Sequence, residues 1–156
     1  MTILGIDPGT TKIGFGVIKN ERNSFEALDY GIISTPGKNK CFDYKMISEK
    51  LSFIINTYKP ERAGVEKLFF SNNQKTAMSV AEARGVIILT LANHNVPIVE
   101  FAPHQVKQAV SAYGSAGKAQ VERMVRIILK IKDPIRPDDA ADALAIAICA
   151  TSNTIY

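Results

Sequence analysis

The first third of the chain alternates between apolar and polar positions in a pattern that predicts three consecutive strands. An apolar run over residues 3–6 ends at Asp7, the turn residues 8–11 follow, and residues 13–17 carry a large apolar side chain at every second position. This order indicates a β-hairpin whose first strand is buried on both faces. Residues 24–34 alternate again and predict a third strand.

The rest of the chain alternates between helical and strand patterns. Helices are predicted over residues 44–58, 76–93, 103–112, 118–129 and 138–150. Asp43 is expected to cap the first of these helices. Further strands are predicted over residues 63–68 and 96–101, and loops at residues 35–40, around Asn72 and Asn73, and at residues 114–117.

The order of these elements predicts an α/β fold. Three strands joined by short turns pair antiparallel, whereas the later strand–helix–strand units pair parallel through right-handed crossovers. The result is a five-stranded mixed sheet with helices on both faces, formed by one domain over residues 1–156. In such a sheet, the strand at residues 63–68 lies beside the strand at residues 3–6.

The helix at residues 76–93 has an unusual second half. Residues 85–92 are apolar nearly all round, and such a helix needs cover on two sides. The sheet supplies one side, and a second subunit is expected to supply the other, as in a homodimer. The alternative is a helix enclosed within its own monomer.

Five carboxylates stand out by their positions. Asp7 closes a buried strand and Glu66 lies in another apolar strand, so both fall near the carboxyl ends of neighbouring strands, where ligands gather in α/β sheets. The last helix begins with Asp138, Asp139 and Asp142. Residues three or four apart lie on the same face of a helix, so either Asp139 or Asp138 can share a face with Asp142. Capping of the helix explains one or two of these acids, and we assign the capping role to Asp138. Asp139 and Asp142 are then left as candidates for a site.

Acids brought this close repel one another unless a cation pairs with them. A cluster of carboxylates without histidine or cysteine favours Mg²⁺, with Mn²⁺ as the substitute, over zinc. Two such ions about 4 Å apart can activate a water and stabilise a leaving oxygen at phosphorus. The predicted reaction is metal-assisted phosphodiester hydrolysis, and the net charge of +4 suits a polyanionic substrate.

Several stretches together resemble the RuvC family of Holliday junction resolvases. They are Gly5-Ile6-Asp7-Pro8-Gly9, Val65-Glu66-Lys67-Leu68-Phe69, Ala83-Arg84-Gly85, Val106-Lys107-Gln108, Gly114-Ser115-Ala116 with Lys118, and Asp139-Ala140-Ala141-Asp142-Ala143-Leu144-Ala145. They run in the family's order over almost the whole chain. The resemblance implies a ribonuclease H-like fold and a homodimer that nicks opposing strands of a four-way DNA junction. It also implies a branch-migration helicase complex as a partner.

The resemblance also assigns roles to single residues. Asp7, Glu66, Asp139 and Asp142 match the metal-binding catalytic acids of the family, which selects Asp139 over Asp138. Lys107 and Lys118 match basic residues that contact DNA near the scissile phosphate, and Phe69 matches an aromatic residue that stacks on an unpaired base.

Three other functions remain open at this point. The opening motif also looks like the phosphate loop of actin-like and sugar-kinase ATPases, although those proteins need two lobes and this chain has room for one. A non-catalytic junction-binding module and a ribonuclease H acting on RNA–DNA hybrids are the others. No signal-peptide pattern and no apolar run long enough to span a bilayer are present, so a cytoplasmic protein without a membrane partner is expected.

Overall fold

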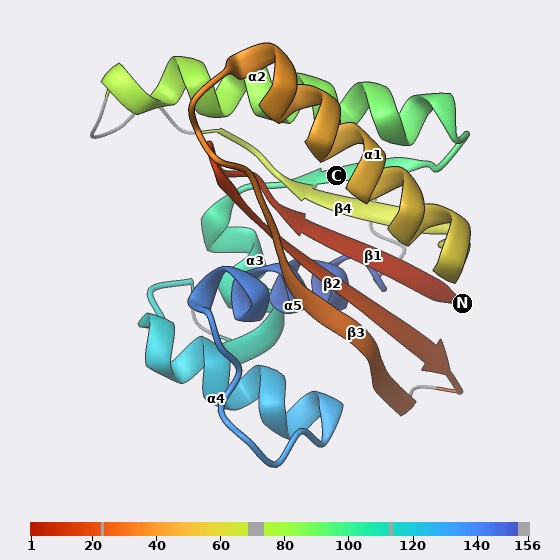
Figure 1. Ribbon diagram of the computed structural model, residues 1–156. Coiled ribbons are helices and arrows are strands. Elements are labelled where there is room, and N and C mark those ends of the chain that lie inside the picture. The colour runs from red at the N-terminus through yellow and green to blue at the C-terminus, as the bar shows by residue number, and fades with distance from the viewer. Residues whose placement is uncertain (23, 69–73, 113, 153–156) are drawn as a thin grey trace.

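The computed structural model describes residues 1–22, 24–68, 74–112 and 114–152. It contains the predicted five-stranded mixed sheet, with strand order β3-β2-β1-β4-β5 (Figure 1). The strands are β1 (Thr2–Asp7), β2 (Lys12–Glu21), β3 (Ser24–Ser34), β4 (Arg62–Glu66) and β5 (Ile98–Phe101). The helices are α1 (Lys40–Tyr58), α2 (Gln74–Asn93), α3 (Pro103–Ser111), α4 (Lys118–Leu129) and α5 (Asp138–Cys149).

The pairing of the strands follows the predicted scheme. β1 pairs antiparallel with β2, which pairs antiparallel with β3, and the two crossover strands β4 and β5 pair parallel. β4 lies directly beside β1, with Ile6 opposite Val65 in the last pair of that ladder. Asp7 and Glu66 are the next residues after this pair on their two strands, so they lie side by side at the same edge of the sheet.

The helices cover the two faces of the sheet in separate layers. α1 and α2 pack on one face, and α3, α4 and α5 pack on the other (Figure 1). Ile3 belongs to the core under α3–α5 and Leu4 to the core under α1 and α2, and both are fully buried. This confirms that β1 is buried on both faces. No helix in the described ranges has the length and apolar character needed to cross a bilayer.

Two predicted helix caps were wrong. α1 begins at Lys40, earlier than expected, because the side chain of Asn39 accepts the first hydrogen bond from the amide of Phe42 at 3.0 Å. Asp43 lies in the first turn and is buried, where it accepts from the amide of Gly37. In α5 the capping position is Pro137, which has no side-chain acceptor.

Asp138 is therefore not a cap. Its carboxylate accepts a hydrogen bond from Arg136 at 3.0 Å on the surface, and its charge lies in the first turn, where the helix dipole favours an acid. Other element ends moved by a few residues. β4 ends at Glu66 instead of residue 68, β5 begins at Ile98 instead of residue 96, and α2 begins at Gln74 instead of residue 76.

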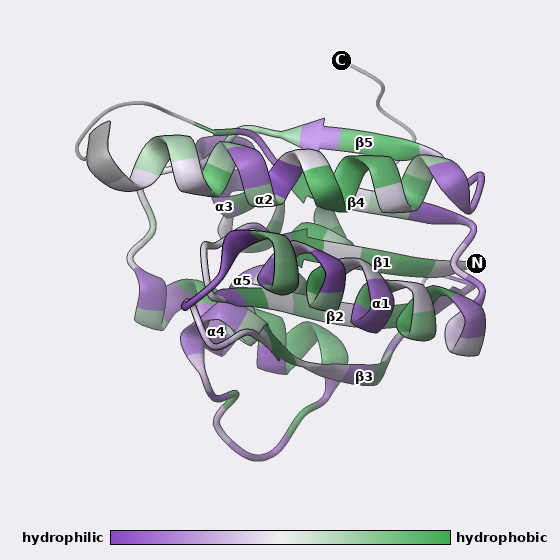
Figure 2. Cartoon of the chain, turned by 45° about the horizontal axis from the view of Figure 1, so that its top comes forward, coloured by the Kyte–Doolittle hydropathy of each residue, from purple (hydrophilic) through white to green (hydrophobic). Residues whose placement is uncertain are grey.

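Among the residues that the structure describes, α2 is covered along one face. Ala83, Ile87 and Leu91 are fully buried against the sheet and α1, whereas Met78 is 70% and Leu89 is 60% exposed. Figure 2 brings this helix to the front and shows hydrophobic residues along its second half. Among the described residues, nothing encloses this helix on its exposed side, which favours the second-subunit interpretation.

Candidate active site

The alternation of the strands aims the first two acids at the same layer of helices. Leu4, Ile6, Ala63 and Val65 belong to the core under α1 and α2. Side chains of a strand alternate between its two faces, so Asp7 and Glu66 point to the opposite face, which α5 covers.

Two glycines let α5 lie directly against this face of the sheet. A methyl group added at Gly5 would collide with the backbone carbonyl of Ala143, and one added at Gly14 would collide with the carbonyl of Asp139. Gly14 is also the register partner of Asp7 across the hairpin. The close approach that these glycines permit therefore sets the start of α5, with Asp139 and Asp142, beside the end of β1.

The predicted residues meet around one cavity of about 320 Å³. Three of the acids and both lysines line it: Asp7, Glu66, Asp142, Lys107 and Lys118. The walls between them are apolar and come from α3, α4 and α5: Pro103, Val106, Val121 and Ile146. Asp139 is not in the lining, but its charge acts on both Asp7 and Asp142. Phe69 and the loop expected around Asn72 and Asn73 lie outside the described residues.

The electrostatics of the cavity disfavour three ionised acids. Burial, followed by the charges of Glu66, Asp142 and Asp139, raises the pKa of Asp7 to about 8. Burial also raises the pKa of Glu66, and the charge of Asp142 adds to this. The pKa of Asp142 is raised by burial too, although Lys118 opposes the shift. The site therefore lacks positive charge when it holds only its own side chains.

The two lysines supply part of that charge. The Lys118 ammonium lies 3.6 Å from Oδ2 of Asp142, and the charge of Asp142 raises the pKa of Lys118. Lys107 and Lys118 both lower the pKa of Glu66. Lys118 stands in the first turn of α4 and Lys107 in the middle of α3. The acids and bases of the cavity therefore come from the ends of two strands, β1 and β4, and from the three helices α3, α4 and α5.

The donor set of the cavity fits a hard divalent cation. Carboxylate oxygens are the ligands that Mg²⁺ prefers, and the shortage of positive charge around Asp7 is what such an ion relieves. In the described part of the chain, no three acids, histidines or cysteines already form a ready-made cage. The acids whose charges act on one another here, Asp7, Glu66, Asp139 and Asp142, would have to move closer together to hold a cation.

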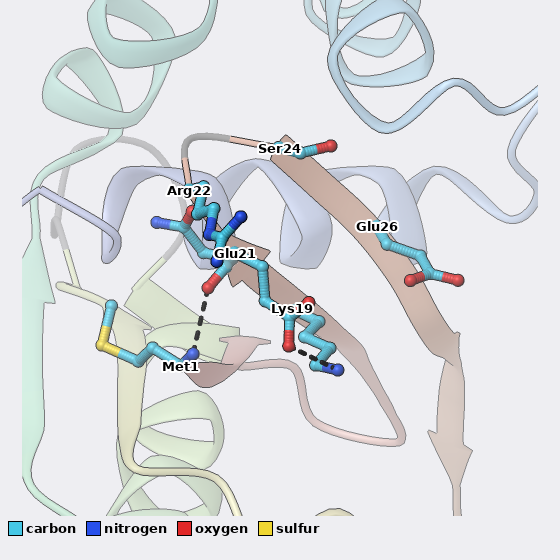
Figure 3. Close-up of a pocket in the computed structure, with 7 residues that line it drawn as sticks. Met1, Lys19, Glu21, Arg22, Ser24 and Glu26 are labelled. Carbon is cyan, nitrogen blue, oxygen red and sulfur yellow. Dashed lines mark hydrogen bonds and ion pairs between the residues drawn. The ribbon is translucent and has the colours of Figure 1, made fainter.

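A larger pocket elsewhere does not contain these residues. Figure 3 shows it at the start of β1 and the β2–β3 turn, lined by Met1, Lys19, Asn20, Glu21, Arg22, Ser24 and Glu26. Its acidic and basic side chains pair with each other, as Lys19 does with Glu21 at 2.6 Å. It lies at the opposite end of β1 from Asp7.

Sequence reasoning assigned no role to the glycines or to Arg84. Gly14 and Gly16 alternate with apolar residues in β2, a signal of a face that something approaches closely. Arg84 was noted only as part of a motif, yet its guanidinium Nε donates to the backbone carbonyl of Glu66 at 3.1 Å.

Comparison with known proteins points to one family. The family model described as crossover junction endodeoxyribonuclease RuvC matches residues 3–150. Proteins of that name from Petrotoga mobilis and Alkaliphilus oremlandii are each 49% identical over 150 residues, covering 96% of this chain and 92% of the relative.

Solved structures show the same similarity. The Thermus thermophilus RuvC structure has 34% sequence identity and a TM-score of 0.89, covering 97% of this chain and 93% of that chain. T. thermophilus RuvC in complex with Holliday junction substrate has 33% identity and a TM-score of 0.90 at the same coverage. The match confirms the ribonuclease H-like fold, and the chain belongs to the RuvC family.

Proposed function

We propose that this protein is a structure-selective endonuclease that resolves four-way DNA junctions by metal-dependent hydrolysis, in recombination and repair. One observation carries the proposal: Asp7, Glu66 and Asp142 line the same cavity as two lysines. Carboxylates bind metal ions such as Mg²⁺, and lysines bind the phosphates of a DNA backbone. The chain's family includes a RuvC protein solved in complex with Holliday junction substrate.

The four acids Asp7, Glu66, Asp139 and Asp142 are the proposed catalytic, metal-holding residues. The proposed cofactor is Mg²⁺, for which Mn²⁺ can substitute. Two ions per active site are proposed. When bound, such ions supply an activated water and charge for the leaving oxygen. Burial raises the pKa of both Asp7 and Glu66, so a bound cation would stabilise their ionised forms.

The lysines and one aromatic residue are the proposed DNA contacts. Lys107 and Lys118 line the cavity beside the acids, where each can bind a phosphate oxygen next to the scissile bond. Phe69 follows β4 in the sequence only three residues after Glu66. Stacking of Phe69 on an unpaired base remains a proposal from the family resemblance.

The proposed enzyme acts as a homodimer, so that two sites nick two opposing strands. The exposed apolar residues Met78 and Leu89 on α2 support a second copy as cover for that face. A branch-migration helicase complex is the proposed further partner. A cytoplasmic location is part of the proposal.

The deciding experiment uses an end-labelled synthetic four-way junction with Mg²⁺, with and without EDTA. Paired symmetric nicks that need Mg²⁺ and Asp7, and that spare linear duplex, support a resolvase. An RNA–DNA hybrid in a parallel reaction tests the ribonuclease H alternative, and an ATP-binding titration tests the ATPase alternative. Tight junction binding without cutting, unchanged in Asp7→Asn, would leave the non-catalytic binding module as the function.

A further inference from the structure

Arg84 of α2 connects three elements on the side of the sheet away from the cavity. Its Nε donates to the carbonyl of Glu66 at the end of β4, 3.1 Å away. Its Nη2 pairs with the carboxylate of Glu100 in β5. The Arg84 side chain is only 16% exposed, whereas that of Glu100 is 41% exposed, so the guanidinium is largely enclosed and its carboxylate partner reaches solvent.

The Glu66 carbonyl lies where the sheet no longer provides a regular partner. The β1–β4 ladder ends at the pair Ile6 and Val65, one residue earlier. On the other side, the amide of the next residue, Lys67, already donates to Phe101 of β5 at 2.8 Å. Glu66 still pairs with Phe101 in the β4–β5 ladder, so Arg84 supplies a hydrogen bond to β4 at the residue where pairing with β1 has already ended.

Arg84 is itself held in place from both sides. Ala83 and Ile87, its neighbours along α2, are fully buried in the core. Glu100 is the register partner of Val65, so its side chain lies on the α2 face of the sheet. A guanidinium presents several donors at fixed angles and can serve a carbonyl and a carboxylate together, which the single ammonium of lysine does less well.

We propose that Arg84 is a positioning residue for the active site: it clamps the backbone of Glu66 from the α2 side, so that the Glu66 carboxylate faces the cavity beside Asp7. This inference deepens the proposed function and rests on it. It also connects α2, the helix with the exposed apolar face, to an acid of the site through one side chain.

The test compares Arg84→Gln with Arg84→Lys, Glu100→Gln and a matched control. The control is Glu82→Gln, which removes another paired charge of α2, one that contacts Lys40 of α1 and not β4. Four quantities are measured: the unfolding midpoint in urea, junction affinity without metal, single-turnover cleavage, and Mn²⁺ binding by the protein without DNA.

For Arg84→Gln, single-turnover cleavage is expected to fall about 10- to 100-fold and Mn²⁺ affinity about 5- to 10-fold, as for lost support behind a metal ligand. Junction affinity is expected to change less than about 3-fold. Arg84→Lys should recover part of both losses, and Glu100→Gln should show a smaller loss. Glu82→Gln should match the wild type in cleavage and Mn²⁺ binding.

Three results would overturn the positioning role. They are unchanged Mn²⁺ affinity in Arg84→Gln, a loss of junction affinity as large as the loss of cleavage, or an equal effect of Glu82→Gln. Exchange of the Lys67 amide, measured by NMR, should quicken in Arg84→Gln while exchange in β1 does not, and uniform quickening would indicate general destabilisation instead. If the wild type fails to cut junctions, the proposed function fails, and Mn²⁺ binding together with Lys67 exchange still decides the role of Arg84.

Discussion

The ammonium of Lys118, in the first turn of α4, lies 3.6 Å from a carboxylate oxygen of Asp142 in α5. The pair faces the cavity that Asp7 and Glu66 also line. Lys118 lowers the pKa of all three of these acids. With Lys107, it is therefore one of two lysine cations in a site whose acids otherwise repel one another.

Lys118→Ala is expected to shift the pH dependence of cleavage. Without this ammonium, the pKa of Asp142 and Asp7 rises further, so more protons compete for the acids at neutral pH. We expect cleavage at about pH 7 to fall about 10- to 100-fold and to recover partly at higher pH. Single-turnover rates across pH measure this. Lys45→Ala, an exposed lysine of α1, is the control, and an equal loss at every pH would contradict the prediction.

Asp7→Asn is expected to change the stability of the metal-free protein with a defined sign. Since the pKa of Asp7 is raised from 3.8 to about 8, the folded state binds more protons than the unfolded state between these values. The free energy of unfolding therefore falls as pH rises through this window. Relative to Asp7→Asn, the wild type should lose on the order of 4 kcal/mol between about pH 5 and about pH 8.5.

Urea unfolding in EDTA at both pH values measures this difference. Glu49→Gln, which alters an exposed acid of α1, should follow the wild type at both. If the difference in unfolding free energy between the wild type and Asp7→Asn were the same at both pH values, Asp7 would ionise freely in the folded protein, which would contradict the prediction.

Binding of Mg²⁺ is expected to release a proton. At about pH 7 the Asp7 carboxyl, with its raised pKa, is mostly protonated, and a cation displaces that proton. Calorimetric titration in buffers of different ionisation enthalpy should report roughly one proton released per site in the wild type. Asp7→Asn should release much less. Binding heats independent of the buffer would refute this linkage.

Gly5→Ala is expected to displace α5 and damage both fold and site. The added methyl meets the backbone carbonyl of Ala143, which cannot move without the helix. We expect a loss of about 2–4 kcal/mol in unfolding free energy. Gly85→Ala is the matched control, since its methyl meets nothing within 4 Å and alanine favours a helix, and it should change stability by less than about 1 kcal/mol. Equal effects would contradict the close approach.

Leu89→Asp is expected to produce a monomer. Leu89 is 60% exposed on α2, and a charge buried in an interface without a partner is costly. Sedimentation velocity should show a dimer for the wild type and a monomer for the variant. Ile127→Asp is the control, because Ile127 is equally exposed, at 59%, but lies on α4. A dimer that survives Leu89→Asp would locate the interface elsewhere.

Much of the fold could be predicted because each element carries its own periodicity. The helix at residues 118–129 was located to the residue. The strand order followed from short connections and right-handed crossovers. The errors lie at the ends of elements, at strand ends such as that of β4 and at helix starts, where Asp43 and Asp138 looked like caps. Several acids or amides can cap a helix, and the choice depends on which backbone amide a side chain reaches.

The sequence by itself determined which side chains can carry the chemistry: carboxylates that end buried strands and begin the last helix, with lysines on the helices between them. Only the tertiary structure decided how they meet. The pleat sends Asp7 and Glu66 to the α5 face, and the missing side chains of Gly5 and Gly14 let α5 close on them. The Arg84 bond to Glu66 was invisible for the same reason: contacts between residues distant in the chain depend on packing, which local periodicity does not encode.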